Sequence, residues 1–384
     1  MTRTLNLVAF VVFASSLFMR STDPVIPQIA SGLSVDVSSA ALLATAFTLP
    51  YALIQPALGA LADTMNKARL MLLCMFVLAA ASIGSALAVN FEMLVIARVI
   101  AGLAAGGVVP IAFAIVGDLV PVAQRQVAMG RLLFAIMTGN LLGATLAGVV
   151  GDLAGWRAVF FCVGAVGAIV LVVAIPAFRR TTEAPKAFDL STLGPNYRTI
   201  FSNPLAKICF GAVFLEAVFM YGVFPYIATL LHEAGETRAS IAGMVIAGFG
   251  IGGALYGLTI SRILPWAGET LLMRAGGIIM GACLIVISLR LPWQVEFVNF
   301  LVLGFGFYFL HAVIQIYASE LAPAARGTAL ALHSFFFFLG HAAGPIVYGV
   351  GLATVGITPV LYVGAIVLAA VGLICAHWLR RHPV

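Results

Sequence analysis

Residues 179–204 read RRTTEAPKAFDLSTLGPNYRTIFSNP, the longest polar stretch in a chain of 384 residues. The stretch contains prolines and charges but no long apolar run, so it predicts a linker rather than a packed element. Six long apolar runs precede it and six follow it. The pattern therefore predicts an N-terminal half over 1–178 and a C-terminal half over 205–384, joined by a cytoplasmic linker over 179–204.

The composition of the chain excludes a water-soluble domain. Hydrophobic residues make up 62% of it and charged residues only 9%, whereas soluble domains have roughly 25% charged residues. The net charge of +6 does not indicate nucleic acid, because the basic residues are scattered between apolar runs. The five cysteines lie in apolar runs without a CxxC pair, so we expect neither disulfides nor a zinc site. The predicted class is an integral membrane protein.

Twelve apolar segments are long enough to cross a lipid bilayer as helices, for which about 20 apolar residues suffice. Arg3 precedes the first segment, but no small-residue cleavage site ends it, so we interpret it as a retained helix rather than a signal peptide. The predicted spans are 5–30, 39–61, 70–89, 91–117, 127–150, 158–178, 205–230, 240–261, 271–290, 293–319, 327–351 and 357–378.

Lysines and arginines predict how these spans are oriented. With the N-terminus in the cytoplasm, 15 of the 20 basic residues fall on the cytoplasmic side and three fall in outer loops, while Arg20 and Arg98 lie within spans. Basic residues are enriched on the cytoplasmic side of membrane proteins. We therefore expect both termini in the cytoplasm, and the inner membrane as the location if the protein is bacterial.

The two halves of the chain resemble each other. VIPQIA at 25–30 matches VFPYIA at 223–228 with an offset of 198, and GNLLGATLAG at 139–148 matches GHAAGPIVYG at 340–349 with an offset of 201. Equivalent helices therefore run in the same direction across the membrane. Two parallel six-helix halves are typical of a secondary transporter with a central site between the halves.

Three motifs resemble those of the major facilitator superfamily. GALADTMNKARL at 59–70 resembles the loop signature between spans two and three, and LVIARVIAGLAAGG at 94–107 is similar to the fourth-helix motif. GNLLGATLAGVVG at 139–151 is similar to the fifth-helix antiporter motif. The resemblance covers the whole chain and points to the twelve-helix drug:proton antiporter group. It implies an all-α membrane protein with twelve transmembrane helices in two parallel six-helix halves, the major facilitator fold.

The resemblance also implies roles for two groups of residues. Charged residues in the cytoplasmic loops would form a conformational latch with neighbouring helix ends. For Arg125 and Arg326 the alternative is that they only set the topology. Small residues of the antiporter motif would let helices approach closely. The latch residues are Asp63, Lys67, Arg69, Arg125 and Arg326, and the helix-packing residues are Gly139, Gly143, Gly148, Gly340, Gly344 and Pro345.

Two residues of opposite charge lie at matching depth in the outer half of the predicted membrane. Asp23 is late in the first span and Arg98 is early in the fourth. Ionisable groups within the membrane mark ion or substrate paths, and the resemblance implies that Asp23 and Arg98 couple transport to protons. A static buried ion pair is the alternative. Arg20 lies one turn before Asp23, and it either pairs with Asp23 or contacts an anionic substrate group.

Polar residues of other spans are candidates for the substrate cavity. Glu216 in the seventh span suits a cationic substrate or a second proton, with a structurally paired acid as the alternative. At the offset of 198, Tyr221 takes the place of Asp23, so the second half lacks that carboxylate. The two histidines either titrate near neutral pH or are packing residues, and Asn140 is the repeat counterpart of His341. The candidates are Arg20, Glu216, Tyr221, Asn140, His311 and His341.

The function that these features favour is proton-coupled efflux of small hydrophobic or drug-like molecules by alternating access. Abundant aromatic side chains suit an apolar pocket for such molecules. The main alternative is a proton symporter or facilitator for a polar metabolite such as an organic anion or a sugar. A membrane-embedded enzyme is a remote alternative, because no nucleophile–base pair and no phosphate-binding glycine loop is visible. We expect no cofactor, no metal and no nucleic acid, and a monomer whose partners are the substrate, protons and the bilayer.

Overall fold

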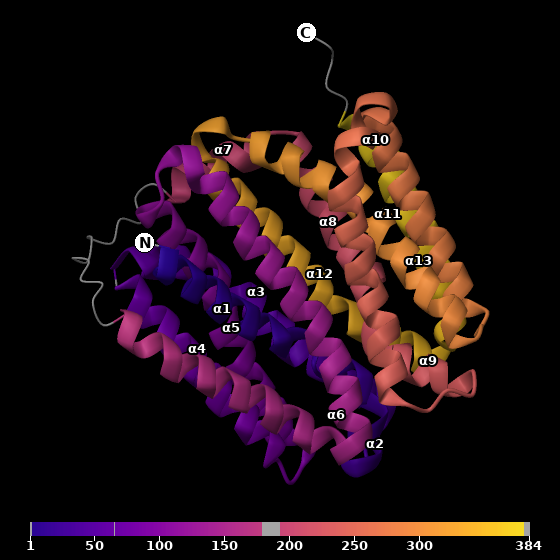
Figure 1. Cartoon of the computed structure of the whole chain (residues 1–384). Helices are drawn as coiled ribbons and strands as arrows, with labels where there is room; N and C mark the ends of the chain where they lie inside the picture. The colour runs from indigo at the N-terminus through magenta and orange to yellow at the C-terminus, as the bar shows by residue number, and fades with distance from the viewer. Residues whose placement is uncertain (1, 65, 179–192, 380–384) are drawn as a thin grey trace. The chain divides into compact units, whose positions relative to one another are not determined.

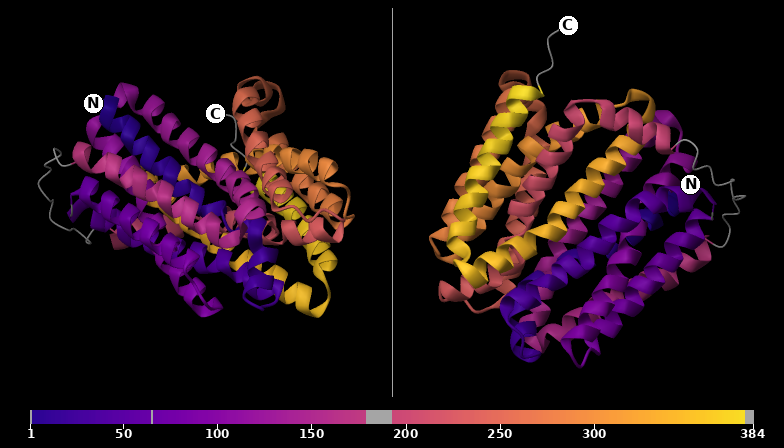
Figure 2. Two further views of the ribbon diagram at one scale, coloured as in Figure 1. Left: turned by 60° about the horizontal axis from the view of Figure 1, so that its bottom comes forward. Right: turned by 180° about the vertical axis from the view of Figure 1, so that it is seen from behind.

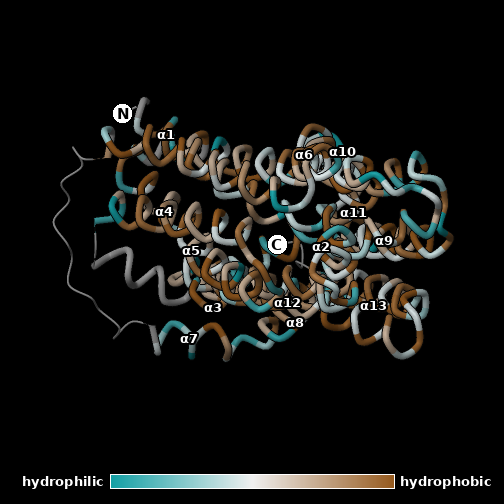
Figure 3. Tube along the Cα trace, turned by 90° about the horizontal axis from the view of Figure 1, so that it is seen from below, coloured by the Kyte–Doolittle hydropathy of each residue, from teal (hydrophilic) through white to brown (hydrophobic). Residues whose placement is uncertain are grey.

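The computed structural model describes residues 2–64, 66–178 and 193–379. Within these ranges all regular elements are helical, without a strand. Hydrophobic residues run along the length of the helices rather than gathering in one place (Figure 3). This distribution is expected for helices that pack against each other on one face and meet lipid on another.

The first of two compact units contains residues 1–190 and the short segment 238–243. In this unit α1 lies along α6, and α3 and α4 both pack against α5 (Figure 1). Its elements are α1 (Thr2–Arg20), the 3-10 helix η1 (Asp23–Val25), α2 (Ile26–Gly32), α3 (Val37–Thr64), α4 (Lys67–Ala86), α5 (Phe91–Leu119) and α6 (Val122–Phe178).

The second unit contains residues 191–237 and 244–384. Here α8 packs against α12 and α13, as Figure 2 also shows from behind. Its elements are α7 (Leu193–Ser202), α8 (Leu205–Tyr221), the 3-10 helix η2 (Phe224–Tyr226), α9 (Ile227–Glu233), α10 (Ala239–Ser288), α11 (Trp293–Glu320), the 3-10 helix η3 (Pro323–Ala325), α12 (Arg326–Thr354) and α13 (Ile357–Trp378). The start of α10, up to Gly243, belongs to the first unit.

The described residues contain ten helical segments that are long and apolar enough to cross a membrane. Two of them, Val127–Pro176 and Ala239–Ser288, have 50 residues each. A helix of that length would extend about 75 Å, far more than the roughly 30 Å of a hydrocarbon core. Each is broken near its middle by a glycine with a positive φ, Gly155 (φ 77°) and Gly268 (φ 69°). Each therefore makes two spans, and the prediction of twelve spans is confirmed.

The C-terminal part of the expected linker forms a helix. Residues 179–192 lie outside the described residues, but α7 follows them directly, and within it Ile200 is fully buried. Directly after this helix in the sequence, the side-chain amide of Asn203 donates a hydrogen bond to the backbone oxygen of Leu321 at 3.1 Å. These contacts attach the end of the segment to the second unit.

The first helix of each unit is interrupted at an equivalent place. Helix α1 ends at Arg20 and η1 begins at Asp23, while α8 ends at Tyr221 and η2 begins at Phe224. The offset between these breaks is 201 residues, not the 198 that the match of VIPQIA with VFPYIA indicates. The expectation that Tyr221 takes the place of Asp23 is therefore wrong. Tyr221 is the counterpart of Arg20, and Phe224 is the counterpart of Asp23.

The prolines give the physical reason for this register. Pro24 and Pro225 each lie in the first turn of a short 3-10 helix. There the missing N–H costs no hydrogen bond, whereas a proline would break a continuous helix. Sequence matching aligns Pro27 with Pro225 instead, because residue identity alone does not show which proline follows the break.

The glycines of the antiporter motif lie where two helices meet. Equivalent glycines of the two units are 201 residues apart, which agrees with the offset between the helix breaks. On α6, Gly139 and Gly143 face the backbone oxygens of Phe13 and Leu17 of α1. A Cβ atom on Gly143 would lie 2.5 Å from the oxygen of Leu17. The corresponding residues of the second unit make the same contacts between α12 and α8, where Gly340 faces Phe214 and Gly344 faces Val218. Both units thus use glycine to bring two helix backbones together.

We expect Gly143→Ala to destabilise the protein by about 1–3 kcal/mol, because the added methyl group overpacks the contact with α1. The measurement is the thermal unfolding temperature of the purified protein in detergent. Gly211→Ala is the matched control, since a Cβ on this α8 glycine would meet nothing within 4 Å and alanine favours a helix. Equal stability of the two variants would contradict the close contact of α1 with α6.

Candidate functional site

A buried ion pair lies at the break between α1 and η1. Nη1 of Arg20 donates to Oδ2 of Asp23 at 3.1 Å. Asp23 is 1% exposed and Arg20 is 6% exposed. The hydroxyl oxygen of Thr22, between the two, is buried and has no hydrogen-bond partner among the described residues. The interrupted helix thus places a carboxylate, a guanidinium and an unpaired hydroxyl together inside the first unit.

Arg98 of α5 lies near this pair but is held mainly by other groups. Its guanidinium stacks over the ring of Phe47, with its carbon 4.3 Å from the ring centroid. Its Nη1 donates to the backbone oxygen of Phe18 at 3.4 Å, and its Nε donates to that of Leu43 at 3.5 Å. The oxygen of Phe18 is available because α1 ends two residues later, and the last carbonyls of a helix lack helical partners.

The structure therefore distinguishes between the two partners that the sequence suggests for Asp23. Arg20 makes the direct ion pair, while Arg98 contributes a longer-range electrostatic attraction to the same carboxylate. A direct ion pair between Asp23 and Arg98 is absent. With both arginines charged, an ionised Asp23 leaves this buried cluster with one net positive charge. The excess charge is stabilised at Arg98, whose guanidinium also has two backbone acceptors and an aromatic face.

The second unit contains a different buried cluster of titratable side chains, formed by Glu216 of α8, His311 of α11 and His333 of α12. Oε2 of Glu216 lies 2.8 Å from Nδ1 of His311. The rings of His311 and His333 are 5.1 Å apart between centroids. Glu216 is fully buried, and its other oxygen Oε1 has no hydrogen-bond partner among the described residues. Nε2 of His333 likewise has no partner in the described part of the chain.

Aromatic rings surround this cluster. His311 stacks on Phe307 with centroids 4.6 Å apart and lies 5.0 Å from Phe337. Tyr221 stacks on His341 at 4.7 Å and meets Phe337 at 5.3 Å. Aromatic rings therefore border His311, the hydrogen-bonding partner of the Glu216 carboxylate. Such a combination attracts cations, since ring faces and a carboxylate are both negative.

Sequence reasoning misses His333, although the sequence contains a signal for it. His333, Phe337 and His341 recur at intervals of four residues and so share one face of α12. Asn140, the counterpart of His341, lies on α6, where its buried Oδ1 has no hydrogen-bond partner among the described residues. No three His, Cys, Asp or Glu side chains within the described ranges are arranged to hold a metal ion.

The residues expected to form a latch make contacts within their own units. Lys67, at the start of α4, forms a salt bridge with Asp118 near the end of α5. Nε of Arg125 donates to the backbone oxygen of Val120 at 2.9 Å. Asp118 is the partner that the sequence does not reveal, because 51 residues separate it from Lys67.

The other expected latch residues are placed differently. Arg326 pairs with Glu320 at 3.1 Å, and both side chains are exposed to solvent. Arg69 is exposed at the start of α4. Asp63 falls in the segment 56–65, outside the residues whose side chains the structure describes. The equivalent loops therefore differ, since Arg326 pairs with an acid and Arg125 binds a backbone oxygen.

Two further residues of the antiporter motif have contacts of their own. Gly148 of α6 faces the backbone oxygen of Ala239 in the segment 238–243 of the first unit. The backbone oxygen of Pro345 accepts a hydrogen bond from the hydroxyl of Tyr226 at 2.9 Å. Both therefore contribute to packing within a unit.

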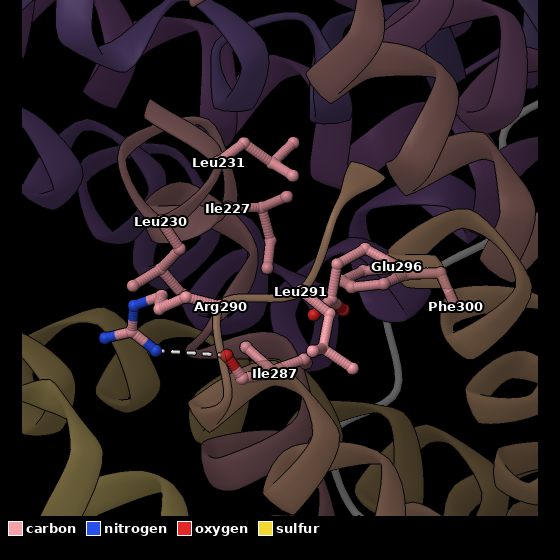
Figure 4. Close-up of a pocket in the computed structure, with 8 residues that line it drawn as sticks. All are labelled: Ile227, Leu230, Leu231, Ile287, Arg290, Leu291, Glu296 and Phe300. Carbon is pink, nitrogen blue, oxygen red and sulfur yellow. Dashed lines mark hydrogen bonds between the residues drawn. The ribbon is translucent and has the colours of Figure 1, made fainter. Parts of the chain in front are cut away.

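An internal void lies between α9, the end of α10 and the start of α11 (Figure 4). Arg290 lies at its edge and donates through Nη1 to the backbone oxygen of Ile287 at 3.0 Å. The volume of the void is about 10 Å³, which is room for one water molecule at most. It is too small for a substrate, and Glu216, His311 and His333 do not line it.

Comparison with known proteins identifies related sequences along the whole chain. The family model of the Major Facilitator Superfamily matches residues 8–345. The MFS-type transporter YtbD of Bacillus subtilis (strain 168) is 25% identical, over 98% of this chain and 96% of its own length. Multidrug resistance protein 1 of the same organism is 23% identical over 90% of this chain and 89% of its own. Quinolone resistance protein NorA of Staphylococcus aureus is 25% identical over 91% and 90%.

Solved structures show the same fold at lower sequence identity. A bacterial homologue of the human lysosomal transporter Spinster, inward-facing and unoccupied, has a TM-score of 0.72 and 18% identity, over 98% of this chain and 95% of its own. The nucleoside transporter NupG has a TM-score of 0.75 and 16% identity, over 98% and 100%. At this identity the likeness extends to the fold alone.

Proposed function

This chain belongs to the major facilitator superfamily and is a secondary transporter of the membrane, not an enzyme, and we propose that it exports small hydrophobic or drug-like molecules in exchange for protons. Among its relatives, two carry names that refer to multidrug resistance and quinolone resistance. The substrate and the use of protons are the parts that the proposal adds.

The observation that most supports proton coupling is the ion pair at the break in the first span. Asp23 is the only acidic residue in the described part of α1, η1 and α2. It is buried within a span, where an ionised carboxylate requires cationic partners. Arg20 and Arg98 supply them in the present conformation. Both arginines favour the ionised form of Asp23, which is the form expected after a proton has been released.

The proposed coupling step is a change in the distance between Asp23 and the two arginines. A nearby cation favours the ionised carboxylate, and removal of the cation from a buried site favours the protonated form. Arg98 is on α5 whereas Asp23 follows α1, so a shift of these helices changes their separation. Proton uptake by Asp23 in one conformation and release in the other would then accompany alternating access.

Glu216 supports a preference for substrates with a cationic group. Its Oε1 has no hydrogen-bond partner among the described residues, and rings of Phe307, Phe337 and Tyr221 lie around the cluster. A cationic aromatic molecule would satisfy this oxygen and stack on the rings. His311, His333 and His341 would then orient the carboxylate and the rings.

The remaining assignments also belong to this proposal. The pair of Lys67 with Asp118 and the contacts of Arg125 and Arg326 would stabilise one conformation as latches. We propose that both termini face the cytoplasm and that the protein works as a monomer in the cell membrane, the inner membrane if it is bacterial. The positive-inside distribution of basic residues supports this orientation.

Transport by the purified protein in liposomes tests the proposed function. With an acidic lumen, we expect uptake of ethidium together with alkalinisation of the lumen, because each inward movement of ethidium would release a proton outward. A protonophore collapses the pH gradient by itself and should therefore abolish the uptake of ethidium. Movement of ethidium and protons in the same direction would instead indicate a symporter. Uptake that is independent of the pH gradient would indicate a facilitator.

A further inference from the structure

A groove of about 540 Å³ runs between α1 and the first part of α6, in the first unit. The two helices lie side by side in both Figure 1 and Figure 2. The groove is separate from the ion pair at Asp23 and from the cluster around Glu216, because none of those residues lines it. Its lining residues are Asn6, Ala9, Phe10, Phe13, Val127, Gly130, Arg131, Phe134, Ala135 and Thr138.

The packing of α1 on α6 explains why a groove exists here. At Gly139 and Gly143 the backbones of α6 and α1 are in close contact. The groove begins directly before this contact, at Thr138, and extends toward Val127. Over that length Gly130 has no atom within 4 Å of the position of a Cβ. The helices therefore diverge from the glycine contact toward the start of α1, and they leave a space whose volume is typical of small-molecule sites.

The walls of the groove combine aromatic surface with a single charge. Phe10, Phe13 and Phe134 provide three rings, of which Phe134 is 71% exposed. Arg131 is exposed, and it has no hydrogen-bond or ion-pair partner among the described residues. Asn6 adds a polar amide, and no acidic residue is among the lining side chains. The groove thus has apolar walls and a net positive charge at one position.

We propose that this groove binds amphipathic organic anions, with the acidic group on Arg131 and the apolar body against the three phenylalanine rings. A guanidinium binds a carboxylate or sulfonate through paired hydrogen bonds, and aromatic walls stabilise a planar apolar body. This inference rests on the proposed export in one respect, because the bound anion is taken to be a transported molecule. It extends the substrates to anions, which Glu216 alone would repel.

The volume and the single positive charge of the groove favour a small organic anion over a membrane lipid. The volume of the groove suits a compact aromatic acid, whereas a two-chain phospholipid would place only part of its body in it. The single free cation also suits a single acidic group. Anionic lipid is therefore the competing outcome that the experiment has to separate.

Equilibrium binding to the purified full chain tests the proposal without any pH gradient. The probe is 1-anilinonaphthalene-8-sulfonate, and its uncharged comparison is N-phenyl-1-naphthylamine, which has the same aromatic body. We expect Arg131→Gln to weaken binding of the sulfonate about tenfold and to leave binding of the uncharged amine unchanged. Arg198→Gln, which removes an exposed charge from α7, is the matched control and should change neither affinity.

A second variant fills the groove without touching its charge. Gly130→Leu adds a side chain where nothing lies within 4 Å, so we expect a folded protein that binds neither probe in the groove. Gly211→Leu on α8 is its control, since that glycine is also open on its Cβ side. Unfolding temperatures of all four variants establish that loss of binding is not loss of structure.

Three outcomes would overturn the proposal. The first is an unchanged sulfonate affinity in both Arg131→Gln and Gly130→Leu. The second is an equal loss in Arg198→Gln, which would reflect net charge alone. The third is loss of wild-type binding in phosphatidylglycerol nanodiscs but not in phosphatidylcholine nanodiscs, which would identify a lipid headgroup as the occupant. Because binding is measured without transport, failure of proton exchange in liposomes would remove the proposed function and leave the groove's selectivity intact.

Discussion

Asp23→Asn is expected to reduce proton-driven uptake of ethidium to the level of liposomes without protein. Asparagine has the shape of aspartate and can still accept a hydrogen bond from Arg20, but it cannot bind and release a proton. The measurement is ethidium accumulation in liposomes with an acidic lumen, alongside exchange of labelled for unlabelled ethidium at equal pH. We expect the exchange to continue, since it requires no net proton movement.

Asp36→Asn is the matched control for that experiment. Asp36 lies outside the spans before α3, where it accepts hydrogen bonds from the backbone N–H and the hydroxyl of Ser39 at 2.8 and 2.7 Å. The hydrogen bond from the Ser39 side chain, with that from its backbone, lowers the pKa of Asp36, so it stays ionised at neutral pH. Asparagine is an equally good helix cap, and transport should be unchanged. Full proton-driven uptake by Asp23→Asn would exclude Asp23 as the coupling residue.

Glu216→Gln is expected to weaken the binding of ethidium about tenfold, because it removes the buried negative charge that attracts the cation. Binding of phenanthridine, which has the ring system of ethidium and is uncharged at pH 8, should be nearly unchanged. The measurement is fluorescence polarisation of ethidium, with phenanthridine as a competitor. The comparison separates recognition of a cation from a general role of the site.

Glu296→Gln is the matched control in the second unit. Glu296 of α11 is 5% exposed and accepts a hydrogen bond from Asn299 at 3.1 Å, so it is a buried acid away from the aromatic cluster. Its replacement should leave both affinities unchanged. An equal loss of ethidium and phenanthridine binding in Glu216→Gln would show that Glu216 holds the structure or a second proton rather than a cationic substrate.

The spans could be predicted from the sequence because insertion into a bilayer depends on local hydropathy. Each stretch of about 20 apolar residues crosses the membrane whatever its neighbours are. The internal repeat and the family motifs are also local, so the fold class follows from them. Even the two helices of 50 residues were predictable as pairs of spans, because a single span cannot be that long.

The candidate site was only partly predictable. The sequence indicates that Asp23, Arg98 and Glu216 lie within spans, since a charged residue in an apolar run is conspicuous. It does not show that Asp23 pairs with Arg20, nor that Glu216 meets His311 and His333. The pair of Arg20 with Asp23 depends on the local geometry of the break after α1. The contacts of Glu216 depend on how α8, α11 and α12 are rotated about their axes and on which helix lies beside which.

Sequence alone determined that this chain is a twelve-span transporter of two repeated halves, with a few charges buried in its spans. The tertiary structure decided the register of the repeat, the partner of Asp23, the histidines around Glu216 and the groove beside Arg131. The physical reason is the range of the interactions. Burial in lipid acts on each segment separately, whereas the contacts of Arg98, the histidines around Glu216 and the groove arise only where residues far apart in the sequence come together.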